Sequence, residues 1–124
     1  MTLFEKTIQA FKNKDIALFE EIHHEDFMFV REFSMYSREE HLTNIKDWSV
    51  STDWHPKVQC INEDEFVLVM RASEVDNNGT QFISNNISIQ PDGLYWRNII
   101  KKKAINPMRI ILITLLMKLA TQLS

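Results

Sequence analysis

Residues 66–100 read FVLVMRASEVDNNGTQFISNNISIQPDGLYWRNII and contain three apolar segments separated by two turn dipeptides. The dipeptides are Asn78-Gly79 and Asp92-Gly93, which are typical of two-residue β-hairpin turns because such turns need residues that tolerate a positive φ. Two turn signals in one stretch predict three consecutive antiparallel strands. With two-residue loops, Met70 pairs with Ile87 on the neighbouring strand.

This register divides the side chains between two faces, because successive residues of a strand point to opposite sides of the sheet. We expect the helices to cover the more apolar face, which carries Phe66, Leu68, Met70, Ala72, Ile83, Ile87, Ile89, Trp96 and Ile100. The opposite face is mixed and carries Val69, Arg71, Ser84, Asn86, Ser88 and Arg97. A bulge in either hairpin would exchange the two faces for part of the sheet. One more strand is expected at about residues 57–61.

The segments before the hairpins predict two helices at the N-terminus. Thr2 and Glu5 have the spacing of a capping box, and apolar residues then recur every three or four positions to about residue 12. A shorter helix is expected to follow, capped by Asn13 or Asp15 and ending near residues 23–24.

The next segment predicts a strand and a third helix. Residues 26–33 have a period of two, and a second capping box at Ser37 and Glu40 opens a helix through Trp48. The element order is therefore α-α-β-α-β-β-β-β. We expect an α+β fold with the N-terminal helices on the concave face of a curved, mainly antiparallel sheet.

Composition indicates one globular domain and excludes several kinds of site. The chain has 124 residues, of which 44% are apolar and 25% charged. We place the domain at residues 1–103 and treat 104–124 as a tail. Two glycines are too few for a phosphate-binding loop or a dinucleotide-binding turn. One cysteine, Cys60, excludes an internal disulfide and thiolate-rich metal sites, and suits a reducing compartment.

Charge is distributed unevenly along the chain. The net charge of −3 argues against nucleic acid as a partner. Residues 1–92 hold 8 basic and 17 acidic side chains, whereas residues 93–124 hold 6 basic and no acidic ones. The first residues lack the pattern of a secretory signal, and we expect a cytoplasmic protein.

Three stretches carry a resemblance to a known family. They are Asn13-Lys14-Asp15-Ile16 with Phe19 and His24-Glu25-Asp26-Phe27, then Ser37-Arg38-Glu39-Glu40-His41-Leu42, and then Pro91-Asp92-Gly93-Leu94-Tyr95-Trp96-Arg97. They resemble the first strand with its preceding helix, the third helix and the penultimate hairpin of the SnoaL-like branch of the nuclear transport factor 2-like superfamily. The resemblance covers about residues 3–103.

This resemblance implies a cone-shaped fold with a pocket between helices and sheet, and often a homodimer through the other sheet face. The superfamily includes isomerases, cyclases, dehydratases, epoxide hydrolases and non-catalytic modules, so the fold alone does not fix a reaction. The general base of its ketosteroid isomerases would fall near Arg31, and their oxyanion-hole acid near Asn85. Their tyrosine on the first helix has no match, and steroid isomerisation is not expected.

Polar residues expected on the apolar inner face are the candidates for chemistry, since burying an unpaired polar group costs on the order of 1 to 3 kcal/mol. They are Arg31, Glu74, Asn85 and Asn98. One hypothesis gives Arg31 a carboxylate or enolate to bind, the asparagines hydrogen bonds to a ligand, and Glu74 the role of a base. The alternative is a structural ion pair between Arg31 and Glu74.

Aromatic residues and histidines provide further candidates. Trp48, Trp54, His55 and Trp96 are expected to line a ligand pocket, although core packing also explains the tryptophans. No histidine pair has the spacing of a zinc enzyme, and we expect no metal site. His23-His24 at the end of a helix favours a structural role.

The tail after Lys101-Lys102-Lys103 is apolar and contains no acidic residue. Asn106-Pro107 ends the strand, and apolar residues then recur every three or four positions. The run 108–120 is shorter than the roughly 20 residues that span a bilayer. We expect an apolar C-terminal helix docked on its own domain or on a dimer partner, and contact of residues 101–124 with a membrane surface is the less favoured alternative.

Two functions from different classes follow. The first is a small-molecule-binding domain that uses the pocket between helices and sheet, with acid/base catalysis on a small acid or carbonyl compound as its enzymatic form. The second is a non-catalytic homodimerisation or protein-interaction module, in which the mixed sheet face and the tail helix bury one another. No cofactor is expected for either, and whether the chain is an enzyme stays open.

Overall fold

Side-chain caps begin the two N-terminal helices, as the sequence predicts. The computed structural model describes residues 1–51, 57–75, 78–105 and 107–123. Helix α1 (Leu3–Asn13) begins after Thr2, whose hydroxyl accepts a hydrogen bond from a first-turn amide. Helix α2 (Ile16–Glu21) begins after Asp15, whose carboxylate does the same.

A strand that the sequence did not predict lies between the second and third helices. Strand β1 (His23–Arg31) begins three residues earlier than expected, and β2 (Ser34–Ser37) pairs with it antiparallel after a tight turn. Glu32 in this turn has a φ of 52°. Helix α3 (Arg38–Ser49) begins with the predicted capping box, in which Ser37 and Glu40 bind each other's backbone amides.

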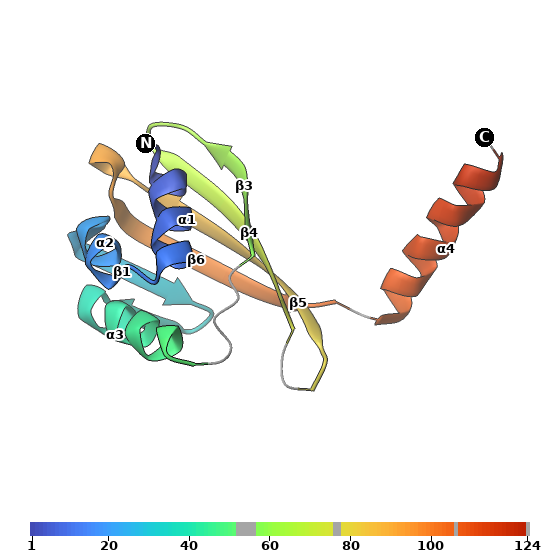
Figure 1. The fold of residues 1–124 in the computed structure, drawn as a ribbon, viewed down its shortest axis with the longest axis horizontal. Coiled ribbons are helices and arrows are strands. Elements are labelled where there is room, and N and C mark those ends of the chain that lie inside the picture. Colours follow the sequence, from blue (N-terminus) through green and yellow to red (C-terminus); the bar gives the residue numbers. More distant parts are fainter. Residues whose placement is uncertain (52–56, 76–77, 106, 124) are drawn as a thin grey trace.

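The remaining strands form a meander that completes a six-stranded sheet. They are β3 (Val58–Glu63), β4 (Val67–Val75), β5 (Gln81–Ile89) and β6 (Tyr95–Ala104). A short 3-10 turn (Pro91–Gly93) joins β5 to β6. The sheet order is β2-β1-β6-β5-β4-β3, in which only β1 and β6 pair in parallel. Helices α1, α2 and α3 lie on one side of the curved sheet, which confirms the α+β architecture (Figure 1).

The predicted faces are wrong for β5. Met70 pairs with Asn86, not with Ile87, because five residues rather than two connect the paired ends Val75 and Gln81. The second connection is also longer than predicted, since Ile89 pairs with Arg97. A shift of one residue moves every side chain of β5 to the opposite face. Strand β4 keeps its predicted faces, and β6 keeps them from Asn98 onward. At the start of β6 the prediction is wrong, because Tyr95 rather than Trp96 lies in the core, and Trp96 lines a hollow at the surface.

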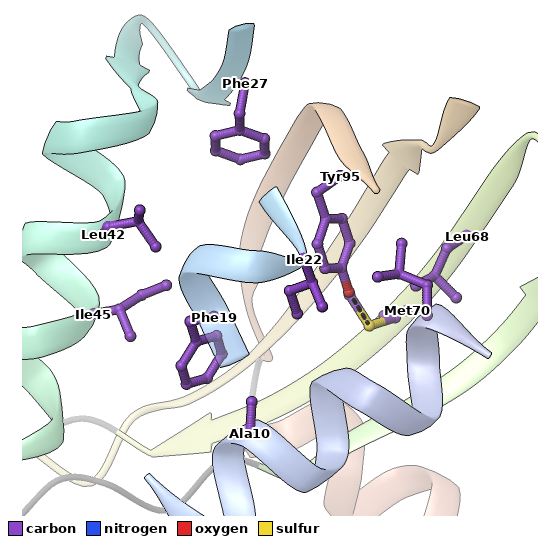
Figure 2. Close-up of a cluster of buried hydrophobic side chains, with 10 residues drawn as sticks. Ala10, Phe19, Ile22, Phe27, Leu42, Ile45, Leu68, Met70 and Tyr95 are labelled. Carbon is purple, nitrogen blue, oxygen red and sulfur yellow. Dashed lines mark hydrogen bonds between the residues drawn. The ribbon is translucent and has the colours of Figure 1, made fainter. Parts of the chain in front are cut away.

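The inner face of the sheet and the three helices enclose the hydrophobic core. Its buried members come from all of these layers and are Leu3, Ala10, Phe19, Ile22, Phe27, Leu42, Ile45, Leu68, Met70 and Tyr95 (Figure 2). Tyr95 places its hydroxyl 2.7 Å from the Thr7 hydroxyl and 3.8 Å from the sulfur of Met70. The core therefore lies toward the end of the sheet where β6 begins.

An apolar row crosses the outer face of the sheet. The pairing aligns Val69, Ile87, Ile99, Val30 and Met35 across five neighbouring strands. Ile87 is 47% exposed and Ile99 52% exposed. The residues of β5 that were expected in the core, Ile83, Ile87 and Ile89, belong to this outer face.

Helix α4 (Pro107–Leu123) extends away from the sheet (Figure 1). The C-terminal helix was predicted, and every α4 residue whose burial is described is exposed. The structure therefore does not show the expected docking of this helix on its own domain. None of the helices among the described residues is long and apolar enough to cross a membrane.

Candidate functional site

A line of polar side chains runs along the inner face of the three central strands. It consists of Glu74 from β4, Ser84, Asn86 and Ser88 from β5, and Asn98 and Lys102 from β6. We call these six residues the polar seam. The alternation of polar and apolar residues in β5 produces it, because the observed register turns the serines inward and the isoleucines outward.

The seam runs from a buried end to an exposed end. Asn98 and Ser88 face each other across β6 and β5 and are 5% and 0% exposed. At the other end, the side chain of Lys102 is 24% exposed and that of Glu74 is 47% exposed. Four residues of extended strand separate Asn98 from Lys102, a length of about 13 Å. The seam is therefore about as long as a small organic molecule.

Hydrogen bonds satisfy most of the seam internally. The Ser88 hydroxyl donates to Asn86 Oδ1 over 3.0 Å, and the Ser84 hydroxyl donates to Glu74 Oε1 over 3.5 Å. The Lys102 ammonium lies 2.9 Å from Glu74 Oε2 and also 4.5 Å from the centre of the Phe82 ring. The exposed end of the seam thus holds a carboxylate and an ammonium in a fixed pair.

Asn98 is the exception. Its side-chain oxygen is buried and has no hydrogen-bond partner among the residues that the structure describes. An unsatisfied buried acceptor costs about 1 to 3 kcal/mol, and native proteins rarely leave one without a water or a ligand. The opposing residues are Ser88 on β5 and Phe29 on β1. This oxygen is therefore a buried acceptor of the seam that the described residues leave unsatisfied.

The predicted polar candidates fall in three different places. Asn98 lies on the inner face as expected, whereas Asn85 lies on the outer face, where its Oδ1 accepts a hydrogen bond from Arg71 Nε over 3.1 Å. The shift in β5 register is the cause. Arg31 is exposed at the end of β1. Glu74 pairs with Lys102, so the structural ion pair predicted between Arg31 and Glu74 is wrong.

The predicted aromatic candidates do not form one pocket in the described part of the chain. Trp48 is at the end of α3 and meets Phe11 edge-on with ring centres 6.0 Å apart. Trp96 lies at the start of β6 under the guanidinium of Arg97, 3.9 Å from its ring centre. Residues 54 and 55, a tryptophan and a histidine, fall outside the described residues.

Two histidines lie in an aromatic cluster beside the core. His23 is buried, and its Nδ1–H donates a hydrogen bond to the Phe19 carbonyl oxygen. His41 stacks on Phe29 with ring centres 4.7 Å apart and also lies 5.2 Å from His23. The sequence placed His23 at the end of one helix and His41 near the start of the next. It gave no signal that the two rings lie close together.

Burial keeps both rings neutral near pH 7. Desolvation lowers the pKa of His23 to about 4, and the Arg38 guanidinium acts in the same direction against the hydrogen bond to Phe19. Desolvation and the proximity of His23 lower the pKa of His41 to about 3. In the ranges that the structure describes, no three His, Cys, Asp or Glu side chains gather as metal ligands.

An open hollow of about 850 Å³ lies at the start of α3, where it meets β1, β2 and the beginning of β6. Its lining includes Glu25, Asp26, Glu39 and Met35. Among the predicted site residues that the structure describes, Trp96 alone contributes to it. No seam residue lines this hollow. It is therefore a surface feature separate from the inner face.

The fold has relatives among solved structures. One is an NTF-2-like protein of unknown function from Burkholderia xenovorans, 14% identical, with a TM-score of 0.63 over 85% of this chain and 84% of that chain. Another is a ketosteroid isomerase-like protein from Kribbella flavida, 13% identical, with a TM-score of 0.65 over 85% and 78%. The chain has the nuclear transport factor 2-like fold.

A third structure with the NTF2-like fold is an LEH-like epoxide hydrolase from M. tuberculosis, which is 13% identical with a TM-score of 0.64 over 82% of this chain and 80% of that one. The fold that the sequence resemblance implied is thus confirmed. No family model matches the sequence. No curated protein matches it either.

Proposed function

We propose that the chain binds a small polar organic molecule along the polar seam, with Asn98 accepting a hydrogen bond from it. The observation that carries the proposal is the buried, unpartnered oxygen of Asn98. An acceptor at this depth selects a hydroxyl, an amine or an amide N–H, because a group without a donor leaves it unsatisfied. A fully substituted amide or an ether is therefore a poor ligand.

The other end of the seam adds charge recognition and a proton acceptor. Lys102 lies about 13 Å from Asn98 along β6, and its ion pair with Glu74 forms the exposed end of the seam. A ligand that reaches them can place an anionic group on Lys102. In the enzymatic form of the proposal, Glu74 takes a proton from a small carbonyl compound held within about 3 Å of its carboxylate.

The comparisons support this proposal only through the fold. Structures with the same fold include proteins named for isomerase and epoxide hydrolase activities, so this architecture accommodates chemistry on small molecules. The SnoaL-like resemblance of the sequence agrees with a small ligand-binding domain. Asn98 and Glu74 remain from the sequence hypothesis as ligand-binding residue and base, and Lys102 replaces Arg31 as the cation.

Paired compounds that differ by one hydrogen-bond donor test the proposal. Ligand-observed NMR would compare 2-pyrrolidinone with N-methyl-2-pyrrolidinone, and benzamide with N,N-dimethylbenzamide. We expect binding of the member with the N–H and at least tenfold weaker binding of its methylated partner. Equal binding of both members would contradict a role for the Asn98 oxygen.

A second candidate function is homodimerisation through the outer sheet face. The apolar row that includes Ile87 and Ile99 favours it, because monomeric proteins rarely expose an extended apolar patch. Ile99→Asp should convert a dimer into monomers in analytical ultracentrifugation. Val50→Asp is the matched control, since Val50 is 87% exposed at the C-terminal end of α3, in the helix layer on the other side of the sheet. An unchanged mass for Ile99→Asp would exclude this interface.

A further inference from the structure

The connection between β4 and β5 places an asparagine directly before a glycine at the surface. Asn78 and Gly79 are both exposed, and Gly79 has a φ of 79°. A Cβ atom added to Gly79 would meet nothing within 4 Å in the described structure, its two chain neighbours aside. The surroundings of Gly79 are therefore open, and no Cβ of its own hinders approach to its main-chain nitrogen.

The hydrogen bonding of this nitrogen differs between the two glycine turns. In the described ranges, the Gly79 N–H has no hydrogen-bond partner. In the second turn, which contains Asp92 and Gly93, the Gly93 N–H donates to the Gln90 carbonyl oxygen over 3.4 Å. A nitrogen whose hydrogen is already bound to an acceptor loses it less readily. Gly79 therefore has the more reactive main-chain nitrogen of the two glycines.

The other asparagines lack this combination of features. Asn78 is the only asparagine in the sequence that precedes a glycine. Asn44 is also exposed, but the next main-chain nitrogen belongs to Ile45 within α3. Asn98 is buried in the sheet. Asn78 is thus the asparagine whose side-chain amide lies beside an unhindered and unbonded main-chain nitrogen.

We propose that Asn78 is a site of spontaneous deamidation. The Gly79 nitrogen loses its proton to hydroxide and attacks the side-chain carbonyl carbon of Asn78. The new N–C bond closes a five-membered succinimide ring, the bond to the side-chain nitrogen breaks, and ammonia leaves with a proton from water. Water then opens the ring at either carbonyl and leaves an isoaspartyl or an aspartyl residue.

The modification changes the charge and the main chain beside the exposed end of the seam. Glu74 pairs with Phe82 one position before the paired ends of β4 and β5, and the modified residue lies in the connection between those ends. The product carries a carboxylate that is ionised near pH 7 in place of a neutral amide. An isoaspartyl residue also adds one carbon to the main chain of this connection. The proposal does not rest on ligand binding by the seam.

Peptide mapping by mass spectrometry after incubation of the full, folded chain tests the proposal. We expect position 78 to yield two products of equal mass, aspartyl and isoaspartyl, which chromatography separates. They should form faster at pH 8.5 than at pH 7, because the attacking nitrogen must lose its proton. Asn44 is the internal control and should be modified at least tenfold more slowly.

Two variants test the attacking atom and the ring. Gly79→Ala adds a Cβ beside the nitrogen and should slow the modification of Asn78 at least fivefold. Asn78→Gln keeps an amide but would need a six-membered ring, so position 78 should stay unmodified. Circular dichroism shows that each variant is folded.

Three results would overturn the proposal. The first is an Asn78 that stays intact at pH 8.5 in the folded chain but is modified in urea, which would show that the fold protects it. The second is an equal rate in Gly79→Ala and the unmodified chain. The third is modification of Asn44 as fast as that of Asn78, which would show that exposure alone decides the rate.

Discussion

Lys102 Nζ lies 2.9 Å from Glu74 Oε2, and this contact joins β6 to β4 across the intervening strand β5. The sequence hypothesis gave Glu74 a different cation, Arg31. The observed pair marks the exposed end of the polar seam and keeps a carboxylate in place there. Because both side chains retain contact with water, the ion pair holds the two charged groups in place but contributes little to the free energy of unfolding.

A double-mutant cycle measures this pair. Glu74→Gln, Lys102→Met and the double variant should give a coupling energy of up to about 1 kcal/mol, the range for solvent-accessible ion pairs. Urea unfolding in low and high salt provides the values, and the coupling should shrink as salt screens the charges. A coupling that does not differ from zero in low salt would mean that the two groups do not interact in solution.

The lowered pKa values of His23, which is buried, and His41, which is partly buried, predict a loss of stability in mild acid. Both have a pKa below the ordinary value of 6.5 in the folded state, so the unfolded chain binds protons more readily below that pH. Their stabilising effect is complete above pH 6.5 and falls toward about pH 4 for His23 and about pH 3 for His41. Each costs about 1.4 kcal/mol per pH unit within its window.

Urea unfolding between pH 6.5 and 5.5 checks this prediction, since carboxylates contribute little there. His41→Phe keeps an aromatic ring against Phe29 but removes one titrating group, so it should reduce the slope by about half. His24→Gln is the control, because His24 lies outside the cluster. An equal slope in His41→Phe and the unmodified chain would contradict the lowered pKa of His41.

The hydroxyl pair of Tyr95 and Thr7 makes a modest contribution to the core. Tyr95→Phe removes a 2.7 Å hydrogen bond but leaves the Thr7 hydroxyl donating to the Leu3 carbonyl over 2.8 Å. No new unpaired group results, so we expect a loss of about 1 kcal/mol in the free energy of unfolding. Chemical denaturation provides the value, and a loss above about 3 kcal/mol would indicate that the hydroxyl has a further role.

Asn98→Leu should leave the ligand-free chain as stable as before or more stable. Leucine has a similar shape and removes an oxygen that lacks a partner among the described residues. The free energy of unfolding should rise by at most about 3 kcal/mol, since an unsatisfied buried acceptor costs about 1 to 3 kcal/mol. Thermal unfolding without ligand checks it. A marked loss of stability would show that the amide is structurally required.

Local signals predicted much of the fold correctly. Both pairs with capping-box spacing mark helix starts correctly, because a cap depends on residues three positions apart. Ser37 and Glu40 form the complete box, whereas Thr2 caps its helix by accepting a hydrogen bond from the Glu5 amide. The strands of the hairpins were also found from their alternation. Strand β2 was missed, because its four residues are too few for a recognisable period. The two-residue turn before it, Glu32-Phe33, contains no glycine or asparagine to mark the positive φ of Glu32.

The site was harder to predict, because it depends on the lengths of connections rather than on local preference. Asn78-Gly79 marked a turn correctly, but it did not show that five residues separate the paired ends of β4 and β5. The connection is three residues longer than the predicted two-residue loop. Because three is an odd number, Asn85 lies on the outer face of the sheet and Ser84 and Ser88 lie on the inner face. The alternation of polar and apolar residues in β5 is compatible with either orientation of the strand, so it does not by itself place the serines on the inner face.

Repeating the paired-compound titration with Asn98→Leu and Asn85→Leu tests the central proposal most directly. Asn85 is the matched control, since it is the same residue type on the outer face of the same sheet. We predict that Asn98→Leu loses the preference for the compound with the N–H, whereas Asn85→Leu keeps it within about twofold. A preference that survives in Asn98→Leu would contradict ligand binding at the polar seam.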